Sequence, residues 1–258
     1  MPGRMQGRVA LVTGGGGGIG EATGRLFAEE GAAVVLLDAS AEVAEAAATS
    51  IAASVDGARV AALGGDVTRE EDARRAVDTA ISRYGALHCL VNVAGVRVYQ
   101  SLAAATPQDW QHILSVNVLG TAFCCKAAIP ALRAAGGGSI VNVSSVYGVM
   151  GRKGMGQYDT TKAAVLGLTR ALAVEEAPHG IRVNAVCPGS TITPYHIRRA
   201  VDQGQTEAEL RRRTANENLL GRWAEPREIA HPILFLACEE SSYITGATLM
   251  VDAGKSVL

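Results

Sequence analysis

The sequence predicts an α/β fold, a doubly wound parallel sheet of about seven strands with helices on both faces. Three observations predict it. Short apolar runs recur along the 258-residue chain, they are almost continuously apolar rather than alternating, and longer Ala-rich amphipathic stretches separate them. Continuous apolar runs are typical of strands buried on both faces, and helical stretches between them suit parallel crossovers.

Each apolar run is bounded by glycine or by a polar residue. The expected strands cover residues 8–13, 32–38, 58–64, 87–93, 138–144, 181–187 and 247–252. No internal repeat and no low-complexity linker divides the chain, and its length lies within the range that α/β folds fill as one domain. We therefore expect a single domain over residues 1–258, with one long irregular stretch from Cys187 to about Leu220.

Composition limits the classes of function. Hydrophobic residues make up 48% of the chain and charged residues 19%, which argues against disorder. The formal net charge is −1, and acidic and basic residues are scattered, so binding to nucleic acid or to an anionic membrane surface is not expected. The five histidines show no metal-ligand spacing and the five cysteines form no CxxC motif. We expect a small-molecule partner, no metal, and cysteines that are reduced and buried.

The location of the protein also follows from absences. We expect no membrane span, because no run of about 18 apolar residues stands out. The opening residues, MPGRMQGRVALVTGG, lack the apolar core and small-residue cleavage site of a secretory signal. The sequence therefore predicts a soluble, cytoplasmic protein.

A glycine-rich turn follows the first expected strand. The segment TGGGGGIG, from Thr13 to Gly20, leads directly into a helical stretch, EATGRLFAEEG. Glycines let the backbone turn tightly and approach a pyrophosphate, whose charge is favoured by the free N–H groups at the start of a helix. A flexible turn is the alternative. In the Rossmann-fold interpretation, the residues of this turn that bind a dinucleotide are Gly14, Gly18, Ile19 and Gly20.

The second expected strand ends in Asp38. A carboxylate at this place suits hydrogen bonding to the adenosine ribose and repels the additional phosphate of NADP. Two unit charges about 4 Å apart at a dielectric constant near 20 interact by roughly 4 kcal/mol. We expect NAD as the cofactor. The alternative for Asp38 is a cap on the next helix.

Tyr158 and Lys162 are four residues apart at the start of a strongly helical segment, so they share one face. A phenol with a pKa of about 10 is a poor base at neutral pH, and a neighbouring ammonium can lower that pKa by several units. Ser145 closes the fifth expected strand, where its hydroxyl could bind a substrate oxygen, and Ser144 is its rival for this role. A helix or turn cap is the alternative for this pair.

Several motifs together resemble the short-chain dehydrogenase/reductase family, in its compact form. They are TGGGGGIG, NVAG, SSVYG, YDTTK and PGSTIT, and the resemblance runs from about Gly7 to Gly254. It implies an NAD-dependent oxidoreductase that interconverts a secondary alcohol and a ketone. It also implies a homotetramer. The expected helices at about 108–135 and 158–177 are apolar or small on more faces than one sheet surface needs, although burial against their own sheet is the alternative.

The resemblance assigns roles to individual residues. It implies Tyr158 as general acid/base, Lys162 as the partner that lowers its pKa and binds ribose, and Ser145 as the group that orients the substrate oxygen. Asn117 matches the asparagine that holds a proton-relay water, although the residues alone would have indicated a polar side chain inside a helix. The match also implies residues that bind the rest of the cofactor: Asp66 and Val67 at the adenine, Asn92, Ala94 and Gly95 in the segment that lines the cofactor, and Gly189, Thr191 and Thr193 around the nicotinamide carboxamide. Pro188 is the last cofactor-binding residue that it implies.

The sequence departs from the family pattern at a few places. Val93 makes NVAG of the commoner NNAG, Asp159 stands where a small neutral residue is more usual, Thr191 replaces the frequent Ile or Val, and the ending VDAG differs from VDGG. None of these changes removes a reacting group.

The stretch at about 190–220 is expected to form two short helices and to act as a substrate lid. Five arginines in this stretch could favour an anionic substrate, as could three basic residues of neighbouring loops. Because acidic residues are interspersed in the stretch, a solvated amphipathic face fits its arginines better. The residues concerned are Arg198, Arg199, Arg211, Arg212, Arg213, Arg97, Arg152 and Lys153.

Two other functions remain open. A 3-oxoacyl-carrier-protein or acyl-CoA reductase of the same family would gain support if arginines line the pocket and if NADPH is accepted. A dinucleotide-sensing protein without turnover is the alternative from a different class, and the complete set of Asn117, Ser145, Tyr158 and Lys162 argues against it.

Overall fold

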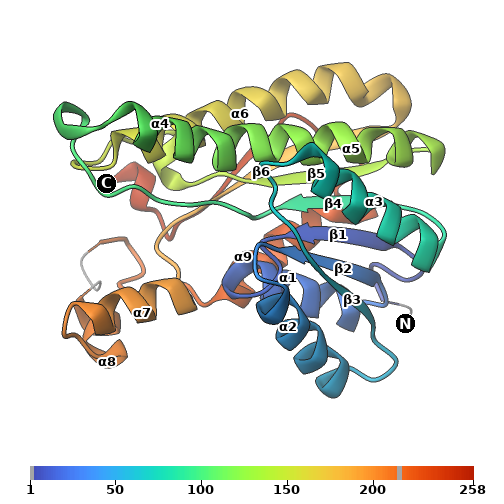
Figure 1. Cartoon of the computed structure of the whole chain (residues 1–258), viewed down its shortest axis with the longest axis horizontal. Helices are drawn as coiled ribbons and strands as arrows, with labels where there is room; N and C mark the ends of the chain where they lie inside the picture. The colour runs from blue at the N-terminus through green and yellow to red at the C-terminus, as the bar shows by residue number, and fades with distance from the viewer. Residues whose placement is uncertain (1–2, 214–216) are drawn as a thin grey trace.

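All seven expected strands are present, and they form one parallel sheet (Figure 1). The computed structural model describes residues 3–213 and 217–258. The sheet order is β3-β2-β1-β4-β5-β6-β7, and each neighbouring pair is parallel. The predicted doubly wound, Rossmann-like α/β fold is thereby confirmed. The strands are β1 (Val9–Thr13), β2 (Ala33–Asp38), β3 (Arg59–Gly64), β4 (Cys89–Asn92), β5 (Gly138–Val143), β6 (Ile181–Pro188) and β7 (Thr248–Val251).

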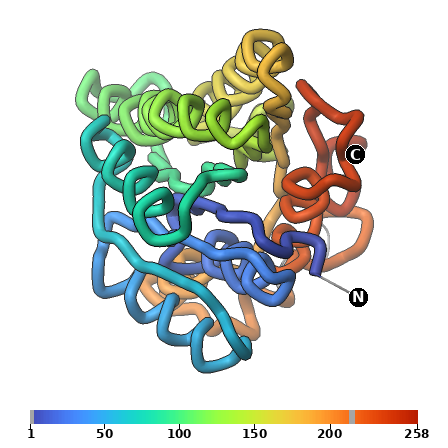
Figure 2. The backbone as a smooth tube through the Cα atoms, turned by 90° about the vertical axis from the view of Figure 1, so that its right-hand side faces the viewer, coloured from blue at the N-terminus to red at the C-terminus, as the bar shows by residue number. Residues whose placement is uncertain are grey.

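Helices cover both faces of the sheet, above and below the strands in Figure 2. On one face lie α1 (Gly18–Glu29), α2 (Ala41–Ser54) and α9 (Pro226–Ala237). On the other lie α3 (Glu70–Tyr84), α5 (Thr121–Ala134) and α6 (Gly156–Glu176). The remaining α-helices are α4 (Pro107–Leu114), which leads toward α5, and the short α7 (Pro194–Asp202) and α8 (Glu207–Arg213).

The central strand β1 shows why these runs are continuously apolar. All five of its residues are buried. Ala10 and Val12 contribute to the core under α1 and α9, whereas Val9 and Leu11 contribute to the core under α3 and α5. A strand with a hydrophobic core on each side needs apolar residues at every position, as the sequence predicted.

The strand order reverses beside β1. From β1 the chain builds outward to β2 and β3, and it then crosses to the other side of β1 to build β4 to β7. The loops that leave the carboxyl ends of β1 and β4 therefore diverge to opposite faces. Open α/β sheets bind ligands in the crevice at this point.

One helical stretch corrects an expectation. Pro107–Ala134 is continuous and, by length and composition, apolar enough to cross a membrane, which the sequence analysis did not foresee. Its inner side is nevertheless part of the protein core, because Cys124, Cys125, Ala128 and Leu132 are buried against the sheet. One side of this stretch is therefore a core element of the fold. Its centre, Ser115–Gly120, is π-helical.

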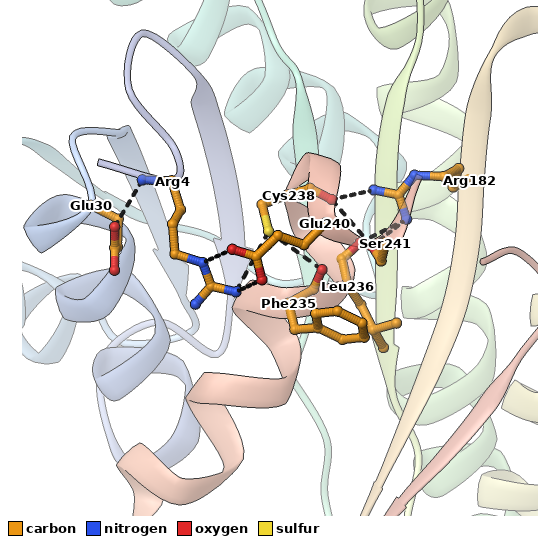
Figure 3. A network of polar contacts seen from close by, with 8 residues as sticks. All are labelled: Arg4, Glu30, Arg182, Phe235, Leu236, Cys238, Glu240 and Ser241. Atoms are coloured by element: carbon orange, nitrogen blue, oxygen red, sulfur yellow. Dashed lines mark hydrogen bonds and ion pairs between the residues drawn. The ribbon is translucent and has the colours of Figure 1, made fainter. Parts of the chain in front are cut away.

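A polar network closes the opposite, amino-terminal edge of the sheet (Figure 3). At the start of β6, the Arg182 guanidinium donates to the carbonyls of Leu236 and Cys238, both at 3.0 Å, and to Ser241 Oγ at 2.8 Å. These are carbonyls at the end of α9, which have no acceptor role left within the helix. Nearby, Arg4 forms an ion pair with Glu240. This edge fastens the last helix to the sheet.

Candidate active site

The glycine-rich turn leaves β1 at the sheet crevice and leads into α1. Gly14 and Gly18 have positive φ angles of 62° and 53°, which favour glycine. A Cβ at Gly14 would lie 2.9 Å from Ala94 N, and one at Gly20 would lie 2.0 Å from Gly14 O, so neither position accepts a side chain. Gly17 caps α1 without a side-chain bond, and a Cβ there would meet nothing within 4 Å. This open, uncapped helix start fits a dinucleotide pyrophosphate.

Asp38 lies against this turn. Its Oδ2 accepts a hydrogen bond from Gly16 N at 2.9 Å, and its Oδ1 accepts from Ser40 N at 3.3 Å. The cap of α2 is Ser40, whose Oγ accepts from Val43 N. The alternative interpretation of Asp38 as a helix cap is therefore wrong. Its carboxylate holds the glycine turn through the Gly16 N–H.

The residues matched to the adenine end follow β3. Asp66 is exposed and its Oδ1 accepts from Thr68 N at 2.9 Å, which fixes the turn. Val67 is buried, and a Cβ at Gly120 would lie 2.7 Å from its Cγ2, so the π-helical segment approaches closely.

Asn92 is buried and is not among the residues that line the crevice. Its Nδ2 donates to Asn142 Oδ1 at 2.9 Å, and Asn142 Nδ2 donates to Thr169 Oγ1 at 3.0 Å. A chain of buried polar groups therefore links β4, β5 and α6. Within the segment matched to the cofactor, Gly95 lines the crevice, and Ala94 N lies against Gly14.

A cleft of about 430 Å³ lies at the carboxyl end of the sheet. It brings together most of the residues matched to the reacting groups and to the nicotinamide end. Its lining includes Ile19, Gly95, Ser144, Ser145, Tyr158, Lys162, Pro188, Gly189, Thr191 and Thr193. These residues come from the starts of α1 and α6 and from the ends of β4, β5 and β6. Asn117 lies behind this lining.

Tyr158 and Lys162 are both buried, with 6% and 5% of their surfaces exposed. Lys162 Nζ donates to Val143 O at 2.9 Å and lies 5.7 Å from the centre of the Tyr158 ring. Burial raises the pKa of Tyr158, but Lys162, Arg97, a hydrogen bond with Ser145 and Arg152 together bring that pKa below its ordinary value. Burial also lowers the pKa of Lys162, and the negative charge of the Tyr158 phenolate opposes this lowering. The site stabilises the phenolate.

The two serines are separated by their hydrogen bonds. Ser144 Oγ donates to the Lys162 carbonyl at 2.7 Å, so its proton is engaged in holding α6. Ser145 Oγ instead accepts from Tyr147 N at 3.2 Å, so its own proton can be donated to the Tyr158 oxygen or to a substrate oxygen. Ser145 is the better placed of the two to donate to a substrate oxygen.

Asn117 occupies the π-helical segment and is 1% exposed. Its Oδ1 accepts from Val96 N at 2.8 Å, and its Nδ2 donates to Val96 O and Thr161 Oγ1. A Cβ at Gly95 would lie 3.3 Å from Asn117 Oδ1 and 3.5 Å from Lys162 Nζ, so both side chains border the same small space. π-Helical segments are frequent at functional sites.

A second cavity of about 460 Å³ continues the cleft outward and shares Arg97, Ser145, Gly189 and His196 with it. Sequence reasoning gave His196 no role. Its Nδ1 lies 2.8 Å from Thr193 Oγ1, and its Nε2 contacts Arg97 Nη1. Burial lowers the pKa of His196 to about 3, with Arg97 adding to the effect. The imidazole is thus neutral and accepts from Arg97. No spacing rule would have found this pair, which is 99 residues apart.

The stretch expected to form a lid does contain two short helices, α7 and α8. Arg199 on α7 faces the second cavity, whereas Arg198 is exposed outside it. Arg211 forms ion pairs with Glu207 and Glu225, and Arg212 and Lys153 are exposed. The Arg213 side chain and residues 214–216 lie outside the described residues.

Two of the departures from the family pattern, Asp159 and Ala253, have distinct local structures. Asp159 Oδ2 accepts from Arg152 N at 3.0 Å and so holds the loop that carries Arg152. Ala253 adopts a φ of 55°, a left-handed conformation that glycine would accept more readily.

The structure also shows the cysteines and the possible metal ligands. The five cysteines are free and buried, as predicted. Among the described residues, His, Cys, Asp and Glu side chains do not gather in groups of three or more that could hold a metal ion.

Comparison with known proteins places this geometry in context. A family model described as enoyl-(acyl carrier protein) reductase matches residues 14–256. A 3-alpha-(or 20-beta)-hydroxysteroid dehydrogenase of Mycobacterium bovis is 41% identical over 98% of this chain and 91% of its own length. A 2-(S)-hydroxypropyl-CoM dehydrogenase 3 of Xanthobacter autotrophicus is 36% identical over 100% of both chains. A 3-oxoacyl-(acyl-carrier-protein) reductase of Thermotoga maritima is 37% identical over 97% of this chain and 98% of its own length.

Proposed function

This chain belongs to the short-chain dehydrogenase/reductase family, and we propose that it interconverts a secondary alcohol and a ketone with NAD(H). Membership makes it an oxidoreductase that uses a nicotinamide dinucleotide and a small-molecule substrate. The meeting of Ser145, Tyr158 and Lys162 at one end of the cleft carries the finer proposal.

The proton of the reaction passes through Tyr158. In the oxidising direction, the Tyr158 phenolate accepts the hydroxyl proton of the alcohol, and Ser145 donates a hydrogen bond to the same oxygen. In the reducing direction, the Tyr158 phenol returns a proton to the carbonyl oxygen. A bound nicotinamide would supply the hydride acceptor for oxidation of the carbinol carbon and the hydride donor for reduction of the ketone. Atoms and charge balance in both directions.

Lys162 and Asn117 support this step from behind. Lys162 stabilises the phenolate by its charge, and its remaining donors suit the nicotinamide ribose. Asn117 borders the space next to Lys162 Nζ, where a water could relay the proton from Tyr158 toward solvent. This assigns Tyr158 and Ser145 to the reacting atoms, Lys162 to the base and the cofactor, and Asn117 to the proton path.

The glycine turn and Asp38 would hold the rest of the cofactor. The uncapped start of α1 suits the pyrophosphate, and the cleft residues Ile19, Gly189, Thr191 and Thr193 suit the nicotinamide end. A carboxylate fixed at Gly16 favours ribose hydroxyls over the NADP phosphate, which supports NAD.

Reduction of a 3-oxoacyl thioester is the second candidate. It is favoured by the arginines that line the second cavity, and a relative carries that name. Asp38 counts against this candidate if the reduction uses NADPH, because the carboxylate repels the additional phosphate. We further propose that α7 and α8 act as a lid and that the enzyme is a homotetramer. We also propose that it works in the cytoplasm, because free buried cysteines suit a reducing compartment.

The proposal is tested by following NADH formation at 340 nm with secondary alcohols, hydroxy acids, steroids and hydroxyacyl thioesters. We expect turnover with NAD, at least tenfold less with NADP, and a loss of about 10³-fold or more in Tyr158→Phe. Fluorescence titration with NADH checks that the variant still binds cofactor. Undiminished turnover in Tyr158→Phe would contradict the assignment of the base, and a preference for NADP would contradict the role of Asp38.

A further inference from the structure

The second cavity is cationic. Three arginines and one lysine line it, and they come from four separate segments of the chain. Arg97 follows β4, Arg152 precedes α6, Arg199 lies on α7 and Lys255 lies near the carboxyl terminus. Among the described residues that line this cavity, Glu217 alone is acidic. It lies 3.4 Å from Lys255, so it compensates the lysine and not the arginines.

Two of the arginines stack on aromatic rings, and none of the three makes a close, hydrogen-bonded ion pair. The Cζ atom of Arg152 lies 3.6 Å from the centre of the Tyr147 ring, and that of Arg199 lies 3.6 Å from the Tyr99 ring. Arg97 lies 5.6 Å from the Tyr195 ring. Stacking on an aromatic face fixes the plane of a guanidinium and leaves the N–H groups at its edge available.

Donor groups at this site lack acceptors. Arg152 Nε and Nη2 are buried without a hydrogen-bond partner. Asp159 forms a long ion pair with this arginine: its Oδ1 lies 3.7 Å from Arg152 Nη2, beyond hydrogen-bond distance, and its Oδ2 accepts from the Arg152 backbone N–H. The acceptor for Arg97 is the neutral imidazole of His196, so within the described residues no carboxylate neutralises Arg97. Buried guanidinium donors left without acceptors are costly unless a ligand supplies them.

The arginines are also close to the reacting groups. The Cζ atoms of Arg97 and Arg152 lie 5.3 Å and 5.6 Å from the centre of the Tyr158 ring. A group bound between them would therefore be only a few bonds from a carbon that Tyr158 and Ser145 activate. A large apolar skeleton in the same place would bury these guanidinium groups without acceptors.

We propose that the substrate is a short alcohol or ketone that carries an anionic oxygen group, which Arg152 and Arg199 bind together with Arg97. The proposal rests on the proposed function, because it names the class of substrate for that reaction. A carboxylate, a sulfonate and a phosphate share the chemistry, since each offers oxygens in a geometry that guanidinium forks match. His196 is a positioning residue that orients Arg97, and because its imidazole is neutral it leaves the charge of the guanidinium uncompensated.

The first test compares 3-hydroxybutyrate with 3-hydroxybutanamide, which differs mainly by its lack of charge. We expect kcat/KM of the wild type to be at least tenfold higher for the carboxylate. Arg199→Gln should lose roughly 10- to 100-fold of kcat/KM for the carboxylate and little for the amide, because a charge-assisted hydrogen bond is removed. Arg198→Gln is the matched control on the same helix, since Arg198 lies outside the cavity, and it should behave like the wild type.

A second measurement needs no turnover. In the presence of NADH, 3-hydroxybutyrate should raise the thermal unfolding midpoint of the wild type and of Arg198→Gln, but not that of Arg199→Gln. The sulfonate and phosphate analogues, 2-hydroxypropane-1-sulfonate and 2-hydroxypropyl phosphate, are then ranked in the same assay to decide which anion fits.

The outcomes separate this inference from the proposed function. Equal or better use of the amide, with turnover that depends on Tyr158, would overturn the anionic substrate and leave the dehydrogenase intact. Binding of the carboxylate through Arg199 without turnover of either compound would support the anion site and count against oxidation of these alcohols. If the protein neither turns over nor binds any of the three anions, the inference is overturned.

Discussion

At the scale of the residue, Tyr158 shows how opposing terms decide the state of one group. Burial alone would raise the pKa of this phenol, yet nearby cations bring it below its ordinary value. Among these cations, Lys162 has the largest effect on the pKa and Arg97 the next. The sequence predicted the contribution of Lys162, because four residues along a helix place two side chains on one face. It did not predict that of Arg97, which arrives from a distant loop.

A pH profile checks this balance. Oxidation requires the phenolate, so kcat/KM for a neutral secondary alcohol should rise with pH through the pKa of Tyr158 and then level off. In Arg97→Gln a cation that lowers this pKa is lost, so the rise should move to higher pH. The rate at pH 7 should fall roughly tenfold, the effect of about 1.4 kcal/mol. Arg198→Gln serves as the control, and an unmoved profile in Arg97→Gln would refute the electrostatic role.

At the scale of the element, Arg182 joins the end of α9 to the sheet. One guanidinium satisfies two terminal carbonyls of the helix and the hydroxyl of Ser241 (Figure 3). Burial lowers the pKa of Arg182, so the protein bears a desolvation cost to keep this charge in place. Its hydrogen bonds must exceed that cost for the arrangement to stabilise the fold.

Replacing Arg182 by Met should therefore destabilise the protein. The methionine keeps an apolar stem but removes the charged donor from the carbonyls of Leu236 and Cys238, which keep only their hydrogen bonds from the Ser139 and Ser241 hydroxyls and the Ser241 N–H. We expect a loss of about 1–3 kcal/mol in the free energy of unfolding. Urea denaturation followed by circular dichroism measures it. The kcat of the folded enzyme should be unchanged, because this edge is opposite the cleft. A loss below about 0.5 kcal/mol would mean that water replaces the guanidinium at no cost.

The elements themselves were largely predictable from the sequence. The seven strands begin and end within about two residues of expectation, because apolar runs stop at glycine or at a polar residue. The helices at 108–135 and 158–177 were also expected. The π-helical segment within the first of them was not, since no residue type marks it. It accompanies the bonds of Asn117 to Val96 and Thr161, which are tertiary contacts that periodicity does not contain.

At the scale of the whole molecule, the site is partly predictable for the same reason. Residues that follow parallel strands meet at one sheet edge, so Asp38, Ser145 and the glycine turn could be placed from their positions alone. The cationic cavity could not be predicted, because Arg97, Arg152, Arg199 and Lys255 converge through loops and short helices. Their sequence spacing carries no information on whether they face one cavity or solvent.

The outer surface of α6 is the other whole-molecule feature that matters for function. It presents a row of small or apolar residues to solvent, and a Cβ at Gly167 would meet nothing within 4 Å. Val174 in the same helix is 78% exposed. The described residues of this chain therefore leave the face uncovered, and a second copy suits it.

Gly167→Glu should dissociate the proposed homotetramer without unfolding the subunit. The glutamate has room on its own chain and improves helix propensity by roughly 0.5–1 kcal/mol, but it would place charge in a closely packed interface. Light scattering after size-exclusion chromatography should give a smaller mass, with an unchanged circular dichroism spectrum. Ala52→Glu, on the exposed side of α2, is the control. A tetramer that persists in Gly167→Glu would place the interface elsewhere.

The buried chain of Asn92, Asn142 and Thr169 sets the alignment of the machinery. A slip of one residue between β4 and β5 would bury amide groups without partners, at about 1–3 kcal/mol for each group, whereas purely apolar strands would tolerate several alignments. Each strand leads directly into a segment of the cleft. The hydrogen bonds of these three residues fix the register of β4 against β5 and the position of α6 relative to β5. They therefore determine how far Gly95 and Ser145 extend toward the helix that carries the base.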